Sequence, residues 1–449
     1  MVDIAADAGA RAGSMRVSGA DRAVTRSGWI TAAAGGGYVA LLVVASRWGE
    51  SLLAHGTRLQ IETPPLNGAF DWRPGRTALP AVGCALLAVL AFPRLIRRAR
   101  WPTVLAAAGL GAIVWAVALA LVDGSAALTQ PLLSDQYLQT ASRVGDLGSF
   151  LATFTQRIAG YNIHTQGHPP GMVVVLWLMN AVGLGGVRWN SVLVYVGGGV
   201  GVVATLVAVR DVAGEDLARR AAPFLVLAPA AVAWTSGDPF FAGVSAWSVA
   251  ALILATGKTG RRSDMLALTG GLLFALTAFL SYGLVLLAIV PVVIAVRRRQ
   301  YRVLEVAAGT VVVVVLLVWI GTGFAWWGGL AATRARYFAG AGGRRPYDYF
   351  LLGNLAAFAV AIGPATVVAL TRLRRSPLAI VVGTAVAVVL LADVSGMSKA
   401  EVERIWLPFV PWVMAAGALL ATQARATRTW LTIQASGALL LAVAIRSPW

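Results

Sequence analysis

One polar stretch interrupts an otherwise almost continuously apolar chain, and it holds residue types that could do chemistry. It runs from Ser134 to Gly171 and contains the carboxylate of Asp135 and the imidazoles of His164 and His168. A carboxylate can act as a general base, and an imidazole can bind a phosphate or a sugar hydroxyl near neutral pH. In a membrane protein, polar residues at this density usually face water, a headgroup or a substrate. The stretch is therefore the first candidate for a functional site.

The sequence leaves more than one role open for Asp135. Apolar residues recur at three- and four-residue spacing from Tyr137 to Ile158, which predicts amphipathic surface helices broken near Gly145 or Gly148. A carboxylate at the start of such a helix could deprotonate an acceptor hydroxyl. Aspartate is also a favoured N-cap residue, so a capping role remains an alternative.

The two histidines lie four residues apart, a spacing that suits a metal site on a helix. The Pro169-Pro170-Gly171 sequence argues against a helix there, and we see no carboxylate that completes a ligand set. We therefore expect no metal ligands, although a divalent metal remains possible. Hydrogen bonding to a phosphate or a sugar fits better, with a structural interfacial role as the alternative.

Composition places the chain in a membrane. Hydrophobic residues make up 58% of the 449 residues and charged residues only 12%, about half of the share in soluble domains. The net charge of +18 gathers in short loops between apolar runs, which is typical of cytoplasmic loops rather than of a nucleic-acid partner. We therefore predict an all-α, polytopic helical membrane protein and no binding to nucleic acid.

Thirteen apolar runs are candidate membrane spans, since each approaches the roughly 20 residues that a crossing needs. They are Trp29–Ser46, Ala78–Phe92, Thr103–Val122, Trp189–Val209, Ala221–Thr235, Phe240–Thr256, Met265–Leu280, Gly283–Val296, Val303–Ile320, Phe350–Leu370, Leu378–Leu391, Ile405–Ala421 and Trp430–Ile445. A further run, Met172–Leu184, is shorter and is opened by prolines. If this run lies along the external surface instead of crossing, every later arginine cluster falls on the cytoplasmic side. We therefore expect an interfacial or re-entrant helix there, with the N-terminus inside.

This topology leaves three longer external segments in the main domain: residues 123–188, 321–349 and 393–404. The second is expected to be a loop, rich in arginine and aromatic residues, that roofs a cavity over Asp135. Arginine forks pair with phosphate, although an aromatic belt with headgroup-binding arginines is the alternative. The third carries charges at the mouth of a span, which suits a site at the membrane boundary as well as a local salt bridge. The predicted substrate-binding residues of these two segments are Arg344, Arg345, Tyr347, Lys399, Glu403 and Arg404.

Several short motifs, in order, resemble the GT-C superfamily of membrane glycosyltransferases in its actinobacterial form. They are S-D-Q-Y at 134–137, G-H-P-P-G at 167–171, D-L-A-R-R at 216–220 and E-V-E-R-I-W-L-P-F at 401–409. The resemblance implies a polyprenyl-phosphate sugar donor, inversion at the anomeric carbon and an aspartate base, which would be Asp135. It also implies that Tyr137, His164 and His168 line the same cavity. The family's second acidic motif is not clear, with Asp146 and Asp238 as its candidates.

The sequence thus predicts a hexosyl- or pentosyltransferase of the bacterial plasma membrane, with its active site on the external face and a glycan, lipid or protein of the cell envelope as acceptor. Residues 1–28 would be a cytoplasmic tail, 29–102 an added helix pair and 103–449 the GT-C-like domain. Two other classes remain open. A transporter or flippase would place charges near the membrane midplane and show internal repeats, and a non-catalytic envelope assembly protein would keep the fold without the activity.

Overall fold

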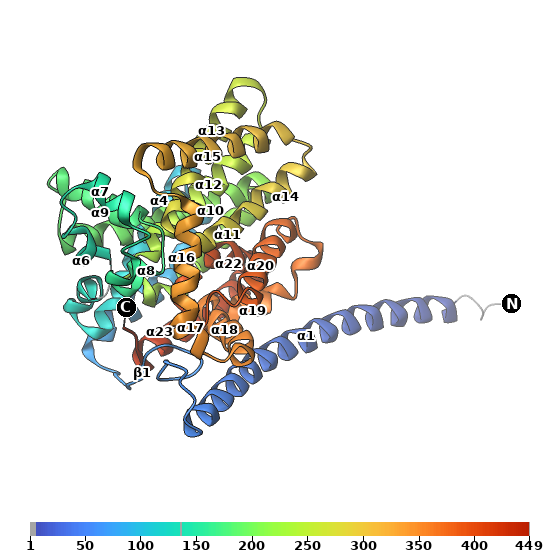
Figure 1. Cartoon of the computed structure of the whole chain (residues 1–449). Coiled ribbons are helices and arrows are strands. Elements are labelled where there is room, and N and C mark those ends of the chain that lie inside the picture. The colour runs from blue at the N-terminus through green and yellow to red at the C-terminus, as the bar shows by residue number, and fades with distance from the viewer. Residues whose placement is uncertain (1–5, 135–136, 449) are drawn as a thin grey trace.

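The chain is almost entirely helical, as expected for an all-α membrane protein (Figure 1). The computed structural model describes residues 6–134 and 137–448, with side chains from Gly28 onward apart from that of Arg375. The helices of the first half are α1 (Ala6–Ala54), α2 (Leu79–Leu90), α3 (Phe92–Arg98), α4 (Trp101–Ala120), α5 (Gln130–Leu133), α6 (Tyr137–Ala141), α7 (Leu147–Thr153), α8 (Ile163–Gln166), α9 (Gly171–Ala181), α10 (Val187–Ala213), α11 (Glu215–Val226) and α12 (Asp238–Thr256). Those of the second half are α13 (Gly260–Leu280), α14 (Ile289–Arg297), α15 (Tyr301–Thr322), α16 (Trp326–Ala339), α17 (Ala341–Arg344), α18 (Tyr347–Ile362), α19 (Pro364–Leu370), α20 (Ala379–Val394), α21 (Val402–Ile405), α22 (Val410–Met414) and α23 (Ala424–Ala444).

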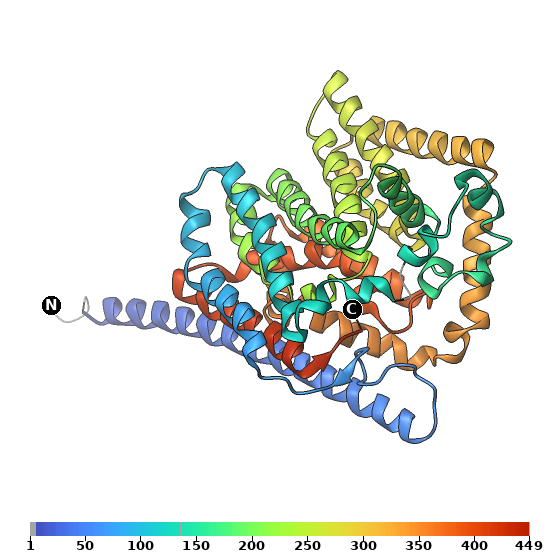
Figure 2. The same cartoon turned by 90° about the vertical axis from the view of Figure 1, so that its left-hand side faces the viewer.

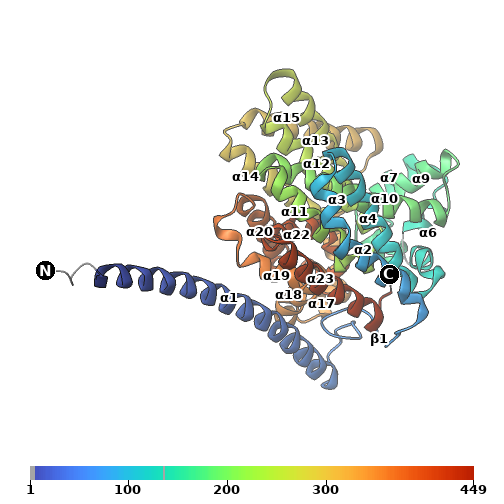
Figure 3. The same cartoon turned by 180° about the vertical axis from the view of Figure 1, so that it is seen from behind.

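Helix α1 reaches far beyond the rest of the molecule and carries the N-terminus away from it (Figures 1 and 3). Its last part packs against α18 and α19. The apolar part, Gly28–Ala54, has only 6% of its most apolar window buried in the protein. Because water would not tolerate so much exposed apolar surface, this helix face suits lipid.

Helices α4, α10, α12, α13 and α15 form a row in which each packs against the next. Close approach within the row depends on glycine. A Cβ on Gly197 of α10 would stand 2.5 Å from the Cα of Phe240, and one on Gly243 would stand 2.4 Å from the carbonyl oxygen of Gly197. The glycine cluster around residue 197, inside an apolar run, is therefore a helix-packing surface.

We predict that Gly197→Ala destabilises the protein by about 1–3 kcal/mol, since the new methyl group meets backbone atoms that cannot move aside. Gly309→Ala in α15 is the matched control, because a Cβ there meets nothing within 4 Å. The control should be neutral or stabilising by up to about 1 kcal/mol, through helix propensity alone. Unfolding of both variants in detergent measures the difference, and equal stabilities would contradict the packing role.

Six helices are long and apolar enough to cross a membrane, or eight if each of two bent pairs is one span, among the described residues. The expected count of thirteen is therefore not confirmed. Proline and glycine explain much of the difference. Gly363 and Pro364 bend α18 against α19 by 105°, and Pro223 lies inside α11 near its end. The run Ile405–Ala421 is broken around Pro408 into the short helices α21 and α22 and the 3₁₀ turns Leu407–Phe409 and Ala415–Leu420.

Helix α9 follows the Pro-Pro-Gly sequence and has 11 residues. At 1.5 Å per residue it rises by about 16 Å, roughly half of the hydrocarbon thickness of a bilayer. It is thus one of the short apolar helices rather than a candidate span, as predicted for Met172–Leu184.

The side on which the later arginine clusters lie can be tested at Arg262, an exposed residue in the first turn of α13. The native cysteine, Cys84, is first replaced by serine. A cysteine introduced by Arg262→Cys should then react with a membrane-impermeant maleimide only from the cytoplasmic side. This is expected if α9 does not cross, because the cluster then faces inward. Labelling from the outside of intact cells would reverse the orientation of everything after α9.

The segment between α1 and α2 returns to the C-terminus instead of standing apart (Figures 2 and 3). Strand β1 (Ala69–Phe70) pairs antiparallel with β2 (Ile445–Arg446), with Ala69 opposite Arg446. Arg73 forms an ion pair with Asp123, directly after α4. The N-terminal segment therefore belongs to the same body as the domain predicted for residues 103–449.

Candidate functional site

Four segments far apart in the sequence bring polar side chains to one cluster, formed by Tyr137, His168, Asp238 and Arg404. Tyr137 comes from α6, His168 from the turn before α9, Asp238 from the start of α12 and Arg404 from α21. Three of these segments carry motifs singled out above, and Asp238 was a candidate for the second acidic motif. We call these four residues the polar cluster.

A buried ion pair forms its base. Arg404 Nη1 lies 2.6 Å from Asp238 Oδ2, and each side chain is only 3% exposed. Arg404 Nη2 also donates to Glu401 Oε2 over 3.1 Å. Because both carboxylates are close to the guanidinium, burial is offset by two charge partners. The local salt bridge left open for this loop therefore exists, but its main partner lies 166 residues away.

Tyr137 stands above this pair in an aromatic setting. Its ring makes edge contacts with His168 and Phe241, with centroids 5.6 and 5.9 Å apart, and with His164 at 6.1 Å. A Cβ on Gly237 would stand 2.9 Å from the tyrosine ring, so the position before Asp238 has no room for a side chain. The Tyr137 hydroxyl is buried and has no hydrogen-bond partner in the described part of the chain. It is a polar group available to a ligand.

The proton position of His168 follows from its surroundings. Its Nδ1 lies 2.9 Å from the carbonyl oxygen of His164, which can only accept. Burial lowers the pKa of His168, against the opposing effect of Asp238, so the ring is neutral at physiological pH. Nδ1 then carries the proton, and Nε2 is left as a hydrogen-bond acceptor. Such an atom can accept from a sugar hydroxyl.

The backbone of residues 400–401 is strained where the cluster is assembled. Ala400 and Glu401 have φ of 71° and 61°, in the left-handed region that non-glycine residues rarely adopt. Asn354 of α18 stabilises this turn: its side-chain amide donates to Asp393 Oδ1 over 2.9 Å, and its oxygen accepts from the backbone N–H of Ala400 over 3.1 Å. Strain held in place by such contacts is a common feature of functional sites.

Arg345 and Lys399, both predicted to bind substrate, are buried and hold backbone segments together. Arg345 donates to the carbonyl oxygens of Leu59, Gln60 and Lys399. Lys399 Nζ donates to the carbonyl oxygens of Gly342 and Arg345, at 2.7 and 3.0 Å. Burial lowers the pKa of Lys399, followed by repulsion from Arg345. These contacts join the α17 region to the loop after α1, and a role in substrate binding stays a prediction.

Glu403 lies inside the protein, where one carboxylate oxygen accepts from the backbone N–H of Asn67 over 3.0 Å. Its other oxygen is buried without a hydrogen-bond partner in the described part of the chain. Burial raises the pKa of Glu403 to about 7, outweighing Asn67 and Arg404, which both lower it. The N-terminal helix pair, for which the sequence suggested no role, thus supports the segment that carries Arg404.

Residues 321–349 are not the expected loop, because most of them form α16 and α17. Alternation of small apolar and long polar residues after Trp326 supports a helix, and the Trp326 indole N–H fixes its start on the carbonyl oxygen of Ala278. Arg336 donates to the Gln166 side chain over 2.9 Å, and Thr333 donates to the Gln166 carbonyl oxygen. Helix α16 therefore lies against the α8 region, beside the histidines (Figure 1).

The remaining predicted residues lie around this arrangement. His164 sits in the one-turn helix α8 and His168 follows it, so the two do not share a helix face. Tyr347 donates from its hydroxyl to the carbonyl oxygen of Val394 over 2.6 Å. Arg344 is exposed at the end of α17 and forms no ion pair with any described residue. Of the three arginines predicted to bind the donor phosphate, Arg344 has the fewest interactions with other described residues.

Asp135, the predicted base, lies outside the described residues, and its role stays a prediction. Tyr137, two positions further along the sequence, is the polar cluster residue whose hydroxyl has no hydrogen-bond partner among the described residues. Within the described ranges, no group of three or more His, Cys, Asp and Glu side chains could hold a metal ion.

Comparison with known proteins gives a partial likeness. The chain is similar to the crystal structure of ArnT from Cupriavidus metallidurans in the apo state, with 18% identity and a TM-score of 0.41. The match covers 62% of this chain and 56% of the ArnT chain, so it spans little more than half of that protein. At this TM-score the likeness assigns no activity or substrate. No protein-family model and no curated protein matches the sequence.

Sequence reasoning did not identify how three residues assemble the site. Asp238 was a candidate only for the second acidic motif, although its position in the Ser-Gly-Asp-Pro turn at the start of α12 was a usable signal. A carboxylate at the start of a helix also interacts favourably with the positive end of the helix dipole. Asn67 and Asn354 gave no such signal, since their partners lie 336 and 39 or more residues away.

Proposed function

We propose that this protein is a GT-C-type membrane glycosyltransferase that transfers a sugar from a polyprenyl-phosphate donor to a cell-envelope acceptor on the external face. The observation that supports this most strongly is the polar cluster. Segments carrying three of the motifs on which the GT-C resemblance rests meet there, in residues Tyr137, His168 and Arg404.

In the proposed reaction, Asp135 takes the proton of an acceptor hydroxyl, and the oxygen attacks the anomeric carbon of the donor. The bond from that carbon to the phosphate oxygen breaks, so polyprenyl phosphate leaves and the configuration inverts. In this proposal, His168 Nε2 accepts a hydrogen bond from the sugar and the Tyr137 hydroxyl, which has no partner among the described residues, donates one. No nucleotide is required, because the donor already carries the energy of the glycosidic phosphate.

The leaving phosphate needs positive charge nearby. The positive charge of Arg404 is balanced by Asp238 and Glu401. Arg404 is therefore better suited to holding the polar cluster together than to attracting an anion from solution. Arg344 is exposed and close in sequence to α16, the helix that contacts Gln166 beside the histidines. We assign the first contact with the donor phosphate to Arg344, with Arg404 stabilising charge once the donor is bound.

Sided vesicles test the proposed function. The purified protein is reconstituted in one orientation and given a set of radiolabelled polyprenyl-phosphate sugars together with delipidated envelope extract as acceptor. Labelled glycoside should form only when donor and acceptor reach the external face. Movement of intact donor across the bilayer without glycoside would support a flippase instead, and neither outcome with any donor would support an assembly role.

A further inference from the structure

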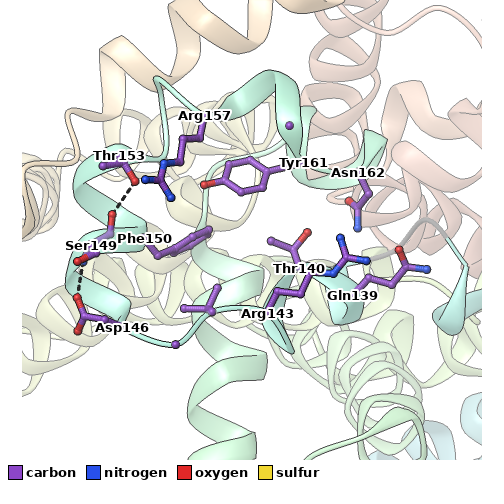
Figure 4. Close-up of a pocket in the computed structure, with 13 residues that line it drawn as sticks. Gln139, Thr140, Arg143, Asp146, Ser149, Phe150, Thr153, Arg157, Tyr161 and Asn162 are labelled. Carbon is purple, nitrogen blue, oxygen red and sulfur yellow. Dashed lines mark hydrogen bonds between the residues drawn. The ribbon is translucent and has the colours of Figure 1, made fainter.

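A separate cavity lies within the first external segment, next to the polar cluster but not part of it (Figure 4). It has a volume of about 330 Å³, near the lower end of the range for small-molecule sites. Helices α6 and α7 and the turn from Arg157 to Asn162 form its walls. None of the residues predicted to act in catalysis or in binding lines it.

The cavity carries a positive charge balance. The side chains of Arg143 and Arg157 come from opposite walls, as Figure 4 shows, and neither forms an ion pair with a described residue. Asp146 is the one carboxylate among the described lining residues. It caps α7 by accepting a hydrogen bond from the backbone N–H of Ser149 over 2.8 Å, and hydrogen bonding from the Ser149 side chain, followed by that from its backbone, lowers the pKa of Asp146. Two arginines against one such carboxylate favour an anionic ligand.

Aromatic and polar groups complete the lining. Tyr161 stacks on Phe154 with centroids 5.3 Å apart and meets the edge of Phe150 at 5.7 Å, so its ring is held in place while partly exposed to the cavity. Amide and hydroxyl groups, among them Asn162 and Thr140, line the other side. A fixed aromatic ring beside hydrogen-bonding groups suits a sugar, which has both apolar C–H faces and hydroxyls.

Residues of the cavity and of the polar cluster lie on the same short helix, α6, which contacts α8. Tyr137 and Thr140 lie three residues apart on α6, and the Thr140 hydroxyl lies 3.1 Å from that of Thr165 in α8. Thr165 in turn stands next to His164. Thr140, which lines the cavity, is therefore about one helical turn from Tyr137 along α6.

We infer that this cavity binds an acidic sugar unit, one bearing a carboxylate or a phosphate, of the acceptor. Its role as acceptor rests on the proposed function, whereas binding itself does not. The two arginines hold the acidic group, Tyr161 contacts the ring, and the neighbouring unit of the acceptor extends toward the polar cluster. An anionic lipid headgroup offers the same charge without the sugar ring, and the experiment separates the two sources.

Equilibrium binding to the full-length protein in phosphatidylcholine nanodiscs tests the inference. The probes are glucuronate, glucose 6-phosphate, glucose and glycerol 3-phosphate, the last standing for a lipid headgroup. The variants are Arg143→Gln and Arg157→Gln. Arg47→Gln is the control, since Arg47 is an exposed arginine away from the cavity that forms an ion pair with Glu50, three residues on.

Both acidic sugars should bind saturably, and each cavity variant should weaken them about tenfold, the effect of losing one charge-assisted hydrogen bond at a partly exposed site. Glucose should bind weakly and Arg47→Gln should change nothing. If glycerol 3-phosphate binds as tightly as the acidic sugars, the cavity does not recognise a sugar ring. If both cavity variants bind the acidic sugars as tightly as the wild type, the cavity is not the binding site. Arginine-dependent binding in a protein that transfers no sugar would refute the proposed function and leave the binding site standing.

Discussion

Asp135→Asn should reduce sugar transfer by about 10²- to 10⁴-fold or more, while the protein stays inserted and folded. Asparagine has nearly the same shape as aspartate but cannot take a proton from the acceptor hydroxyl. Donor binding should survive, because the phosphate contacts are assigned to arginines. The measurement is initial transfer rate at saturating donor, with the unfolding temperature of the purified variant beside it.

Glu62→Gln is the matched control for this variant, since it removes an exposed carboxylate from the loop between α1 and α2. It should transfer sugar at the wild-type rate. If Asp135→Asn also keeps full activity, Asp135 is not the base, and Asp238, the carboxylate of the polar cluster, becomes the next candidate.

Arg404→Gln should destabilise the protein by about 3–5 kcal/mol and abolish transfer with it. The substitution leaves Asp238 buried at the start of α12 with its main charge partner removed, and an uncompensated buried charge is costly. Asp238→Asn should have an effect of similar size. The double variant should be less unstable than the sum of the two, because neither residue then leaves the other uncompensated.

A surface pair of similar geometry provides the comparison. Arg302 lies 2.8 Å from Asp264, with an Arg302 side chain that is 72% exposed. Arg302→Gln should cost less than about 1 kcal/mol. Denaturant unfolding of the variants in detergent measures all of these effects. If Arg404→Gln is as mild as Arg302→Gln, the ion pair does not hold the polar cluster together.

Local patterns in the sequence predicted local features well. The amphipathic run after Tyr137 is two short helices, α6 and α7, with the break at residues 142–146 that Gly145 suggested. The short helix after the Pro-Pro-Gly sequence and the packing glycines of α10 also follow from neighbouring residue types alone. In each case, the physical cause lies within a few residues of the feature.

What the sequence could not predict depends on contacts across the chain. Apolar runs show which segments could cross a membrane, but not how sharply a proline or glycine bends the helix there, so the predicted count of thirteen spans is not confirmed. The loop expected at residues 321–349 is a helix because Trp326 and Arg336 are fixed by distant partners. Nothing in the spacing of Asp238 and Arg404 announces that they form one buried pair.

The most direct test of transfer is the product balance of a single turnover with a defined polyprenyl-phosphate sugar. The central claim is that the protein breaks the bond between sugar and phosphate and passes the sugar to an acceptor. We predict one molecule of polyprenyl phosphate for each glycoside formed, with inverted anomeric configuration. The acceptors used are ones that other preparations of the same envelope glycosylate. Recovery of intact donor after incubation with them, on either side of the membrane, would contradict the claim.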